Sequence, residues 1–281
     1  MNLKPVVLCA DDYAQDAGVS RAVRGLAAAG RLTATSCLVL SPRWREEAAA
    51  LAPLRGKLDV GLHLDATSPF AALAGHGAGL GAVMARAALR LSRAGEVAHW
   101  LEPQFDAFER AWGAPPDHVD GHQHVQQFAG IREALLACIA RRYASGERPY
   151  LRVSRAARGQ ADAKACVIAA WGAGALTRGA RLRAVPVAGP LSGVYDFRGG
   201  QERYARLMAR WLAGAEAGTL LMCHPAQGLP SASELEDDPI AHARRAEFAH
   251  LDSDAFGRQL EAAGVALVRG GGPRGAYTRR P

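Results

Sequence analysis

Two adjacent aspartates, Asp11 and Asp12, follow the apolar run Pro5 to Ala10 near the start of the chain. Neighbouring carboxylates at a strand end repel each other and lose solvation, and a bound cation or an exchanged proton relieves that cost. An isolated Asp-Asp pair is also typical of a solvated turn or of a cap for the next helix. The pair therefore indicates a metal site only if other ligand types reach the same place.

Three further segments place histidine at the end of a short apolar run. His63 closes one run, His224 follows Leu220 to Cys223, and the segment Asp117 to Val125 contains three histidines and two acids. A lone histidine in such a position is more often a core or rim residue than a ligand. A cluster of histidines has little structural purpose, because each buried imidazole needs a hydrogen-bond partner, and a metal gives the cluster a function.

The elements that must position these residues alternate between short apolar runs and alanine-rich helical patterns, which predicts a parallel sheet. At this length the pattern favours an α/β barrel in a single domain, residues 1–281. The expected strands are 5–10, 33–40, 58–64, 118–120, 150–154, 182–187, 219–223 and 265–268, and the expected helices are 19–29, 43–51, 131–143, 161–171, 203–215 and 254–263.

In such a barrel the carboxyl ends of the strands share one face, where sites are built. The polar strand ends would therefore meet, and the segments 65–81 and 225–239 are expected to be loops on that face, the first as an insertion or lid. A carboxylate and two imidazoles would leave open positions for water and substrate. That donor set suits zinc and equally magnesium or manganese, and it is typical of catalytic rather than structural metal sites.

Composition limits the other classes of function. The formal net charge is +7, but the arginines are scattered among alanines as on solvated helix faces, and only 269–281 resembles a basic tail. This distribution argues against a nucleic-acid partner and against stable membrane insertion, and no run reaches the roughly 20 apolar residues of a spanning helix. Five cysteines without a CxxC pair argue against disulfides and thiolate zinc sites, so a cytoplasmic location is expected.

Four motifs together resemble the YdjC family, also called the ChbG/HpnK carbohydrate deacetylases. They are Ala10-Asp11-Asp12-Tyr13, Gly61-Leu62-His63-Leu64, the run from Asp120 to Val125, and Met222-Cys223-His224-Pro225. The similarity covers about Val6 to Leu267, and the motifs stand in the family's order and spacing. It implies a distorted (β/α) TIM-like barrel and allows a homodimer.

The resemblance also implies roles for individual residues. Asp12, His63 and His122 match the ligands of one divalent metal ion, Mg²⁺ or Zn²⁺. Asp11 matches the catalytic base, and His224 matches the histidine of the late strand, which we expect to protonate the departing amine or to steady the oxyanion. The implied substrates are N-acetylated amino sugars, and a chito-oligosaccharide, a lipid-linked aminosugar and a modified surface glycan are all open.

The chain departs from the family pattern at a few positions. Tyr13-Ala14 stands where Phe-Gly is usual, Gln126 replaces a further histidine, and Asp65 replaces a common asparagine. Two more residues are candidates for auxiliary or substrate contacts: His124 could support His224 or orient a ligand, and Arg152 could contact a sugar or a carboxylate, or form a surface ion pair.

The sequence thus predicts a metal-dependent hydrolase that removes an acetyl group from an amino sugar, acting on a linear amide bond. One alternative is a metal-dependent phosphoesterase, since the same cation could polarise a phosphoryl group. The other is a basic binding protein for anionic ligands in which the clusters are structural. That protein would bind without metal and in a salt-sensitive manner.

Overall fold

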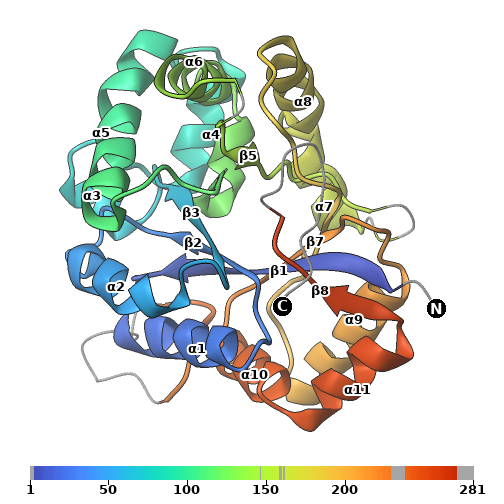
Figure 1. Ribbon diagram of the computed structural model, residues 1–281. Coiled ribbons are helices and arrows are strands. Elements are labelled where there is room, and N and C mark those ends of the chain that lie inside the picture. Colours follow the sequence, from blue (N-terminus) through green and yellow to red (C-terminus); the bar gives the residue numbers. More distant parts are fainter. Residues whose placement is uncertain (1–2, 146, 158–159, 161, 229–237, 271–281) are drawn as a thin grey trace.

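The computed structural model describes residues 3–145, 147–157, 160, 162–228 and 238–270. Its centre is one curved sheet of parallel strands with helices on the outside (Figure 1). The strands are β1 (Lys4–Tyr13), β2 (Ala34–Cys37), β3 (Asp59–Leu64), β4 (His118–Gly121), β5 (Tyr150–Leu151), β6 (Leu191–Ser192), β7 (Leu220–Cys223) and β8 (Val265–Leu267).

The helices that connect these strands cover the outer face of the sheet (Figure 1). They are α1 (Ala17–Ala28), α2 (Trp44–Leu51), α3 (Pro69–Leu73), α4 (Leu80–Ala88), α5 (Ala94–Trp112), α6 (Ile131–Arg142), α7 (Ala163–Ala170), α8 (Ala173–Leu182), α9 (Gln201–Ala213), α10 (Ala241–Leu251) and α11 (Asp254–Ala262), with short 3₁₀ turns at Ala52–Leu54 and His122–Gln127.

The strand order β5-β4-β3-β2-β1-β7-β6 places the long strand β1 in the middle of the sheet. The middle of β1, from Val7 to Ala10, pairs with β7, while its first residues pair with β8. The two outer strands approach each other, because isolated bridges join Leu151 to Val187 and Ala156 to Leu191 of β6. The sheet is therefore curled into the distorted TIM-like barrel that the sequence predicted.

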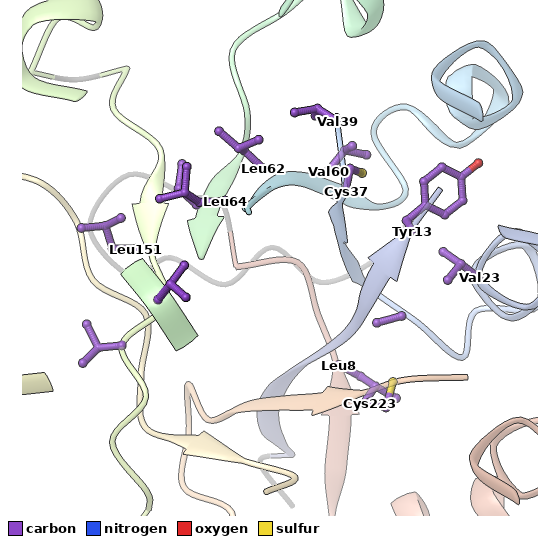
Figure 2. Packing of buried hydrophobic residues seen from close by; sticks show 14 of the residues in the cluster. Leu8, Tyr13, Val23, Cys37, Val39, Val60, Leu62, Leu64, Leu151 and Cys223 are labelled. Carbon is purple, nitrogen blue, oxygen red and sulfur yellow. The ribbon is translucent and has the colours of Figure 1, made fainter. Parts of the chain in front are cut away.

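Apolar residues pack in two places, on the outer face of the sheet and inside the barrel. Along β3, Val60, Leu62 and Leu64 point outward into the main core beneath the helices (Figure 2), whereas Gly61 and His63 point inward. This alternation is what a parallel strand covered on both sides requires. A second, smaller apolar cluster, which includes Val7, fills part of the barrel interior. The remaining interior positions carry polar side chains, and these build the site.

Most of the predicted elements are present, but one strand is wrong. Residues 182–187 do not form a strand, because α8 continues to Leu182 and the next strand, β6, begins only at Leu191. The run instead contains the end of the helix, a turn, and Val187, which makes only an isolated bridge to Leu151. The segment 65–81, expected to be a loop, contains α3. No helix in the described ranges is both long and apolar enough to cross a membrane.

Candidate metal centre

A β-bulge at the end of β1 turns two consecutive aspartates toward the barrel interior. Ala10 pairs with Thr35 and Tyr13 pairs with Cys37, so β1 uses three steps where β2 uses two. The backbone of Asp12 is left-handed there, with φ 66°, a conformation that aspartate tolerates better than most residues. Strict alternation would have placed Asp11 and Asp12 on opposite faces of the sheet. The bulge is therefore the structural reason for the Asp-Asp motif.

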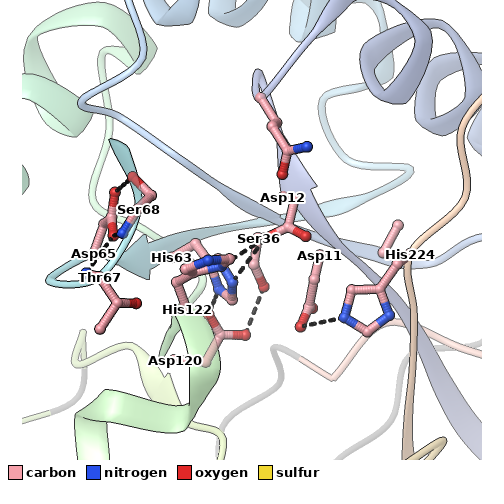
Figure 3. Close-up of polar contacts among 12 residues, drawn as sticks. Asp11, Asp12, Ser36, His63, Asp65, Thr67, Ser68, Asp120, His122 and His224 are labelled. Carbon is pink, nitrogen blue, oxygen red and sulfur yellow. Dashed lines mark hydrogen bonds and ion pairs between the residues drawn. The ribbon is translucent and has the colours of Figure 1, made fainter. Parts of the chain in front are cut away.

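Asp12, His63 and His122 form a compact group, which we call the triad (Figure 3). Oδ1 of Asp12 lies 3.0 Å from Nδ1 of His122 and 3.3 Å from Nε2 of His63. The three donor atoms all lie within 4.8 Å of one another. Asp12 and His63 are buried, while the His122 side chain remains 20% exposed. One carboxylate oxygen and two imidazole nitrogens converge, and solvent reaches the group at His122, so these residues fit a catalytic divalent cation.

His63 is held by Asp120 on the neighbouring strand. The two residues are register partners in the β3–β4 pair, so their side chains project on the same side, and Nδ1 of His63 lies 2.6 Å from Oδ1 of Asp120. Burial lowers the pKa of His63, but the carboxylates of Asp120 and Asp12 outweigh that effect and raise it to about 10. A carboxylate on Nδ1 fixes the ring and directs Nε2 toward the triad, as in other metal sites.

Asp11 is held by Arg152, which follows β5. The guanidinium donates two parallel hydrogen bonds, from Nη1 to Oδ1 at 2.6 Å and from Nη2 to Oδ2 at 2.7 Å, and Nη1 also lies 3.0 Å from Asp120. Burial raises the pKa of Asp11, but the charge of Arg152 outweighs it and keeps the carboxyl ionised. Arg152 is 1% exposed. Arg152 therefore does not form the surface ion pair that the sequence allowed, because its ion pair with Asp11 is buried. Its contact with a substrate stays a prediction.

His224 lies beside Asp11, with 3.8 Å between Nε2 and Oδ2 (Figure 3). Its backbone N–H donates to Oε2 of Glu247 at 2.5 Å, and the ring of Phe197 meets its imidazole edge to face. Burial lowers the pKa of His224 to about 4. The expectation that His224 titrates near neutral pH is wrong for this environment, because burial disfavours the charged ring.

The remaining candidates lie around this centre without joining the triad. The ring of His124 contacts the hydroxyl of Ser154, with 2.8 Å between Nδ1 and Oγ. Gln126 donates to the backbone carbonyl of Arg152, and Asp65 accepts from Thr67 and Ser68 within its own loop (Figure 3). The carboxylate of Asp65 thus accepts hydrogen bonds from its own loop.

A second group of metal-ligand types lies deeper in the barrel, and we call it the Ser36 cluster. Cys9, His118 and Asp120 surround the hydroxyl of Ser36. Its Oγ lies 3.4 Å from Sγ of Cys9, 3.0 Å from Nε2 of His118 and 2.6 Å from Oδ2 of Asp120. Burial and the charge of Asp11 raise the pKa of the Cys9 thiol well above its usual range. Thiols bind metals as thiolates, and the hydroxyl of Ser36 already lies among the three side chains, so we interpret the Ser36 cluster as a hydrogen-bonded polar core rather than a metal site.

Comparison with known proteins places this architecture in a family. The model of the family described as YdjC-like protein matches residues 5–262. The chain belongs to the YdjC-like family. The expected resemblance is confirmed. A comparison with curated proteins found no match for this YdjC-like chain.

Solved structures share the fold. A putative cellobiose-phosphate cleavage protein from Enterococcus faecalis V583 is 20% identical with a TM-score of 0.69, over 95% of this chain and 97% of that one. A peptidoglycan N-acetylglucosamine deacetylase is 11% identical with a TM-score of 0.51, over 95% and 86% of the chains. A family 4 acetyl xylan esterase from Clostridium thermocellum, in complex with a cobalt ion, is 10% identical with a TM-score of 0.50, over 95% and 88%.

Sequence reasoning missed several residues that shape the centre. The supporting role of Asp120 depends on strand register, and that of Ser36 on a strand pairing that no motif marks. Arg244 and Glu247 come from α10, a helix that the sequence analysis did not predict. Their signal was two opposite charges three residues apart in an alanine-rich segment, which is also typical of a solvated helix face.

Proposed function

We propose that this YdjC-like protein is a metal-dependent N-deacetylase that releases acetate from an N-acetylated amino sugar. The observation that carries the proposal is the open triad with an ionised, arginine-held Asp11 and a buried His224 beside it. Asp12, His63 and His122 would hold the divalent cation, zinc or magnesium. A cation bound there supplies a Lewis acid for the acetamide carbonyl and lowers the pKa of a nearby water.

Asp11 acts in this proposal as the general base. It is ionised and buried, and Arg152 fixes both of its oxygens in one orientation, so the carboxylate can accept a proton from the attacking water without first moving. The ion pair lowers the basicity of Asp11, and the lowered pKa of the water compensates for that. General-base help of this kind contributes about 10²- to 10⁴-fold.

His224 acts in this proposal on the tetrahedral intermediate, after water has attacked the acetamide carbonyl. With a pKa of about 4 it enters as a neutral imidazole, which can donate a hydrogen bond to the oxygen on which negative charge develops. Nε2 lies 3.8 Å from Oδ2 of Asp11, so the ring and the base act in the same part of the site, and Asp11 returns the proton that it took from water to the departing amine. The C–N bond then breaks with acetate and a free amine as products.

The substrate class rests on family and fold rather than on the geometry of the site. The peptidoglycan N-acetylglucosamine deacetylase with the same fold acts on an N-acetylated amino sugar, and the YdjC resemblance implies the same class. Among the linear amides, we therefore expect the N-acetyl group of an amino sugar to be the bond that this site hydrolyses.

The test is acetate release from a panel of N-acetylated sugars, including chito-oligosaccharides and lipid-linked N-acetylglucosamine, with and without a chelator. We expect release that the chelator abolishes, that added divalent metal restores, and that the variant His122→Ala lacks. Release of phosphate from phosphoesters, with every acetylated sugar intact, would replace this function by a phosphoesterase.

A further inference from the structure

Arg244 of α10 is a buried arginine that contacts Asp12 through the carboxylate oxygen that does not face the two histidines. Its Nη2 donates to Oδ2 of Asp12 at 2.7 Å and to Oε1 of Gln15 at 3.0 Å, and its Nε donates to Oδ2 of Asp238 at 2.6 Å. The side chain is 2% exposed. A guanidinium fixed by three partners and shielded from solvent has little freedom to change orientation.

Because of this contact, the two carboxylate oxygens of Asp12 have different partners. Oδ1 faces both imidazoles, at 3.0 Å and 3.3 Å, whereas Oδ2 is engaged by Arg244. A carboxylate held in this way offers one oxygen to a cation and keeps the other in a charge-assisted hydrogen bond. Binding through both oxygens would bring the cation and the positive guanidinium of Arg244 to the same oxygen, Oδ2, and it would fill a position that water or substrate needs.

We propose that Arg244 is a positioning residue that holds Asp12 as a one-oxygen ligand and thereby sets the affinity and coordination number of the metal centre. This inference rests on the metal site of the proposed function. It goes beyond that function because it assigns control of the centre to a helix that lies outside the barrel and supplies no member of the triad. The positive charge of Arg244 also lowers the pKa of Asp12, against the effect of burial.

A purely structural role for Arg244 would look different. In that case the arginine would only tie α10 and Asp238 to the end of β1, and its loss would reduce the stability of the protein without changing how a cation is bound once the protein is folded. The two roles are separated by measuring the bound cation itself rather than the folded fraction or the catalytic rate.

The experiment is a titration of the metal-free protein with Co²⁺, followed by calorimetry and by visible absorption. We expect the unaltered protein to bind one equivalent. Arg244→Met should bind Co²⁺ about 10- to 100-fold more weakly, as is usual when a group supporting a ligand is lost. Its absorption band should also be weaker, because a two-oxygen Asp12 raises the coordination number of Co²⁺ and higher-coordinate Co²⁺ absorbs less.

The matched control is Arg142→Met, which removes a partly buried arginine paired with Asp106 and Glu109 on α5. It should leave the Co²⁺ affinity and spectrum unchanged. If Arg244→Met does not fold, Asp238→Asn tests the same idea, since it loosens the guanidinium while leaving the contact with Asp12, and it should shift affinity and spectrum in the same direction by less.

Unchanged affinity and spectrum in a folded Arg244→Met, or in Asp238→Asn where the first variant fails to fold, would overturn the positioning role and leave the proposed function standing. Absence of Co²⁺ binding by the unaltered protein, with Zn²⁺ and Mg²⁺ also not bound, would overturn the metal site and this role together.

Discussion

The triad and the Ser36 cluster occupy the same barrel interior and contain the same kinds of side chain, yet they are suited to different tasks. In the Ser36 cluster a hydroxyl already lies between the thiol, the imidazole and the carboxylate and is within hydrogen-bond distance of each of them. In the triad the donor atoms face one another with no such group between them, and His122 remains partly exposed. Composition alone therefore does not define a metal site. The decisive features are what lies between the donors and whether solvent reaches them.

The largest contrast should appear in metal binding. His122→Ala removes a ligand from the triad and should weaken the binding of Zn²⁺ or Co²⁺ by about 100-fold or more, because losing even a supporting group costs about 10- to 100-fold. Cys9→Ala alters the Ser36 cluster and should leave the affinity unchanged. Calorimetry on both variants checks this, and the opposite ranking would contradict the assignment of the two clusters.

Turnover should depend on Asp11 independently of metal binding. Asp11→Asn removes the base while keeping the shape of the side chain, so the kcat for acetate release should fall by about 10²- to 10⁴-fold with the metal content unchanged. Asp65→Asn is the matched control, since that carboxylate serves only its own loop, and its kcat should be nearly unaffected. Full activity of Asp11→Asn with native metal content would remove Asp11 from the mechanism.

The Ser36 cluster should matter for stability. Ser36→Ala leaves Asp120 and His118 without the hydroxyl that they contact, and an unsatisfied buried polar group costs about 1–3 kcal/mol. Urea unfolding of the metal-free protein measures this change in the free energy of unfolding. An unaltered free energy of unfolding, or a second equivalent of metal bound by this variant, would show that the cluster is not a core stabilised by its hydrogen bonds to Ser36.

The smallest effect concerns the turn after the triad ligand. Ala14 adopts a left-handed backbone, with φ 72°, in the position where the family usually has glycine. Ala14→Gly should therefore raise the free energy of unfolding by up to about 1 kcal/mol. Ala22→Gly, in the interior of α1, should lower it by about 1 kcal/mol. Destabilisation of equal size in both variants would show that the turn carries no backbone strain.

The sequence predicted the barrel because short apolar runs and helical patterns alternate strongly, and it predicted the members of the site because each lies at the end of such a run. It failed at residues 182–187, where a helix ends, a turn follows and only Val187 makes an isolated bridge to Leu151. It also did not assign supporting roles to Asp120, Ser36, Arg244 and Glu247. Those roles depend on strand register and on the docking of α10, which tertiary packing determines and local pattern does not.

The departures from the family pattern show the same limit. The hydroxyl of Tyr13 contacts Glu47 on the outer side of the sheet, and Gln126 supports the backbone of Arg152. Both substitutions therefore act on the scaffold rather than on the open side of the triad. Only the direction of each side chain reveals this, and a sequence does not record direction at a bulge or in a loop.

The most direct test of the central claim is the location of a bound cation in crystals grown with Zn²⁺, using anomalous scattering at the zinc absorption edge. The account predicts a single peak between Asp12, His63 and His122. A peak among Cys9, His118 and Asp120, or no peak at the triad in protein whose acetate release requires Zn²⁺, would contradict it.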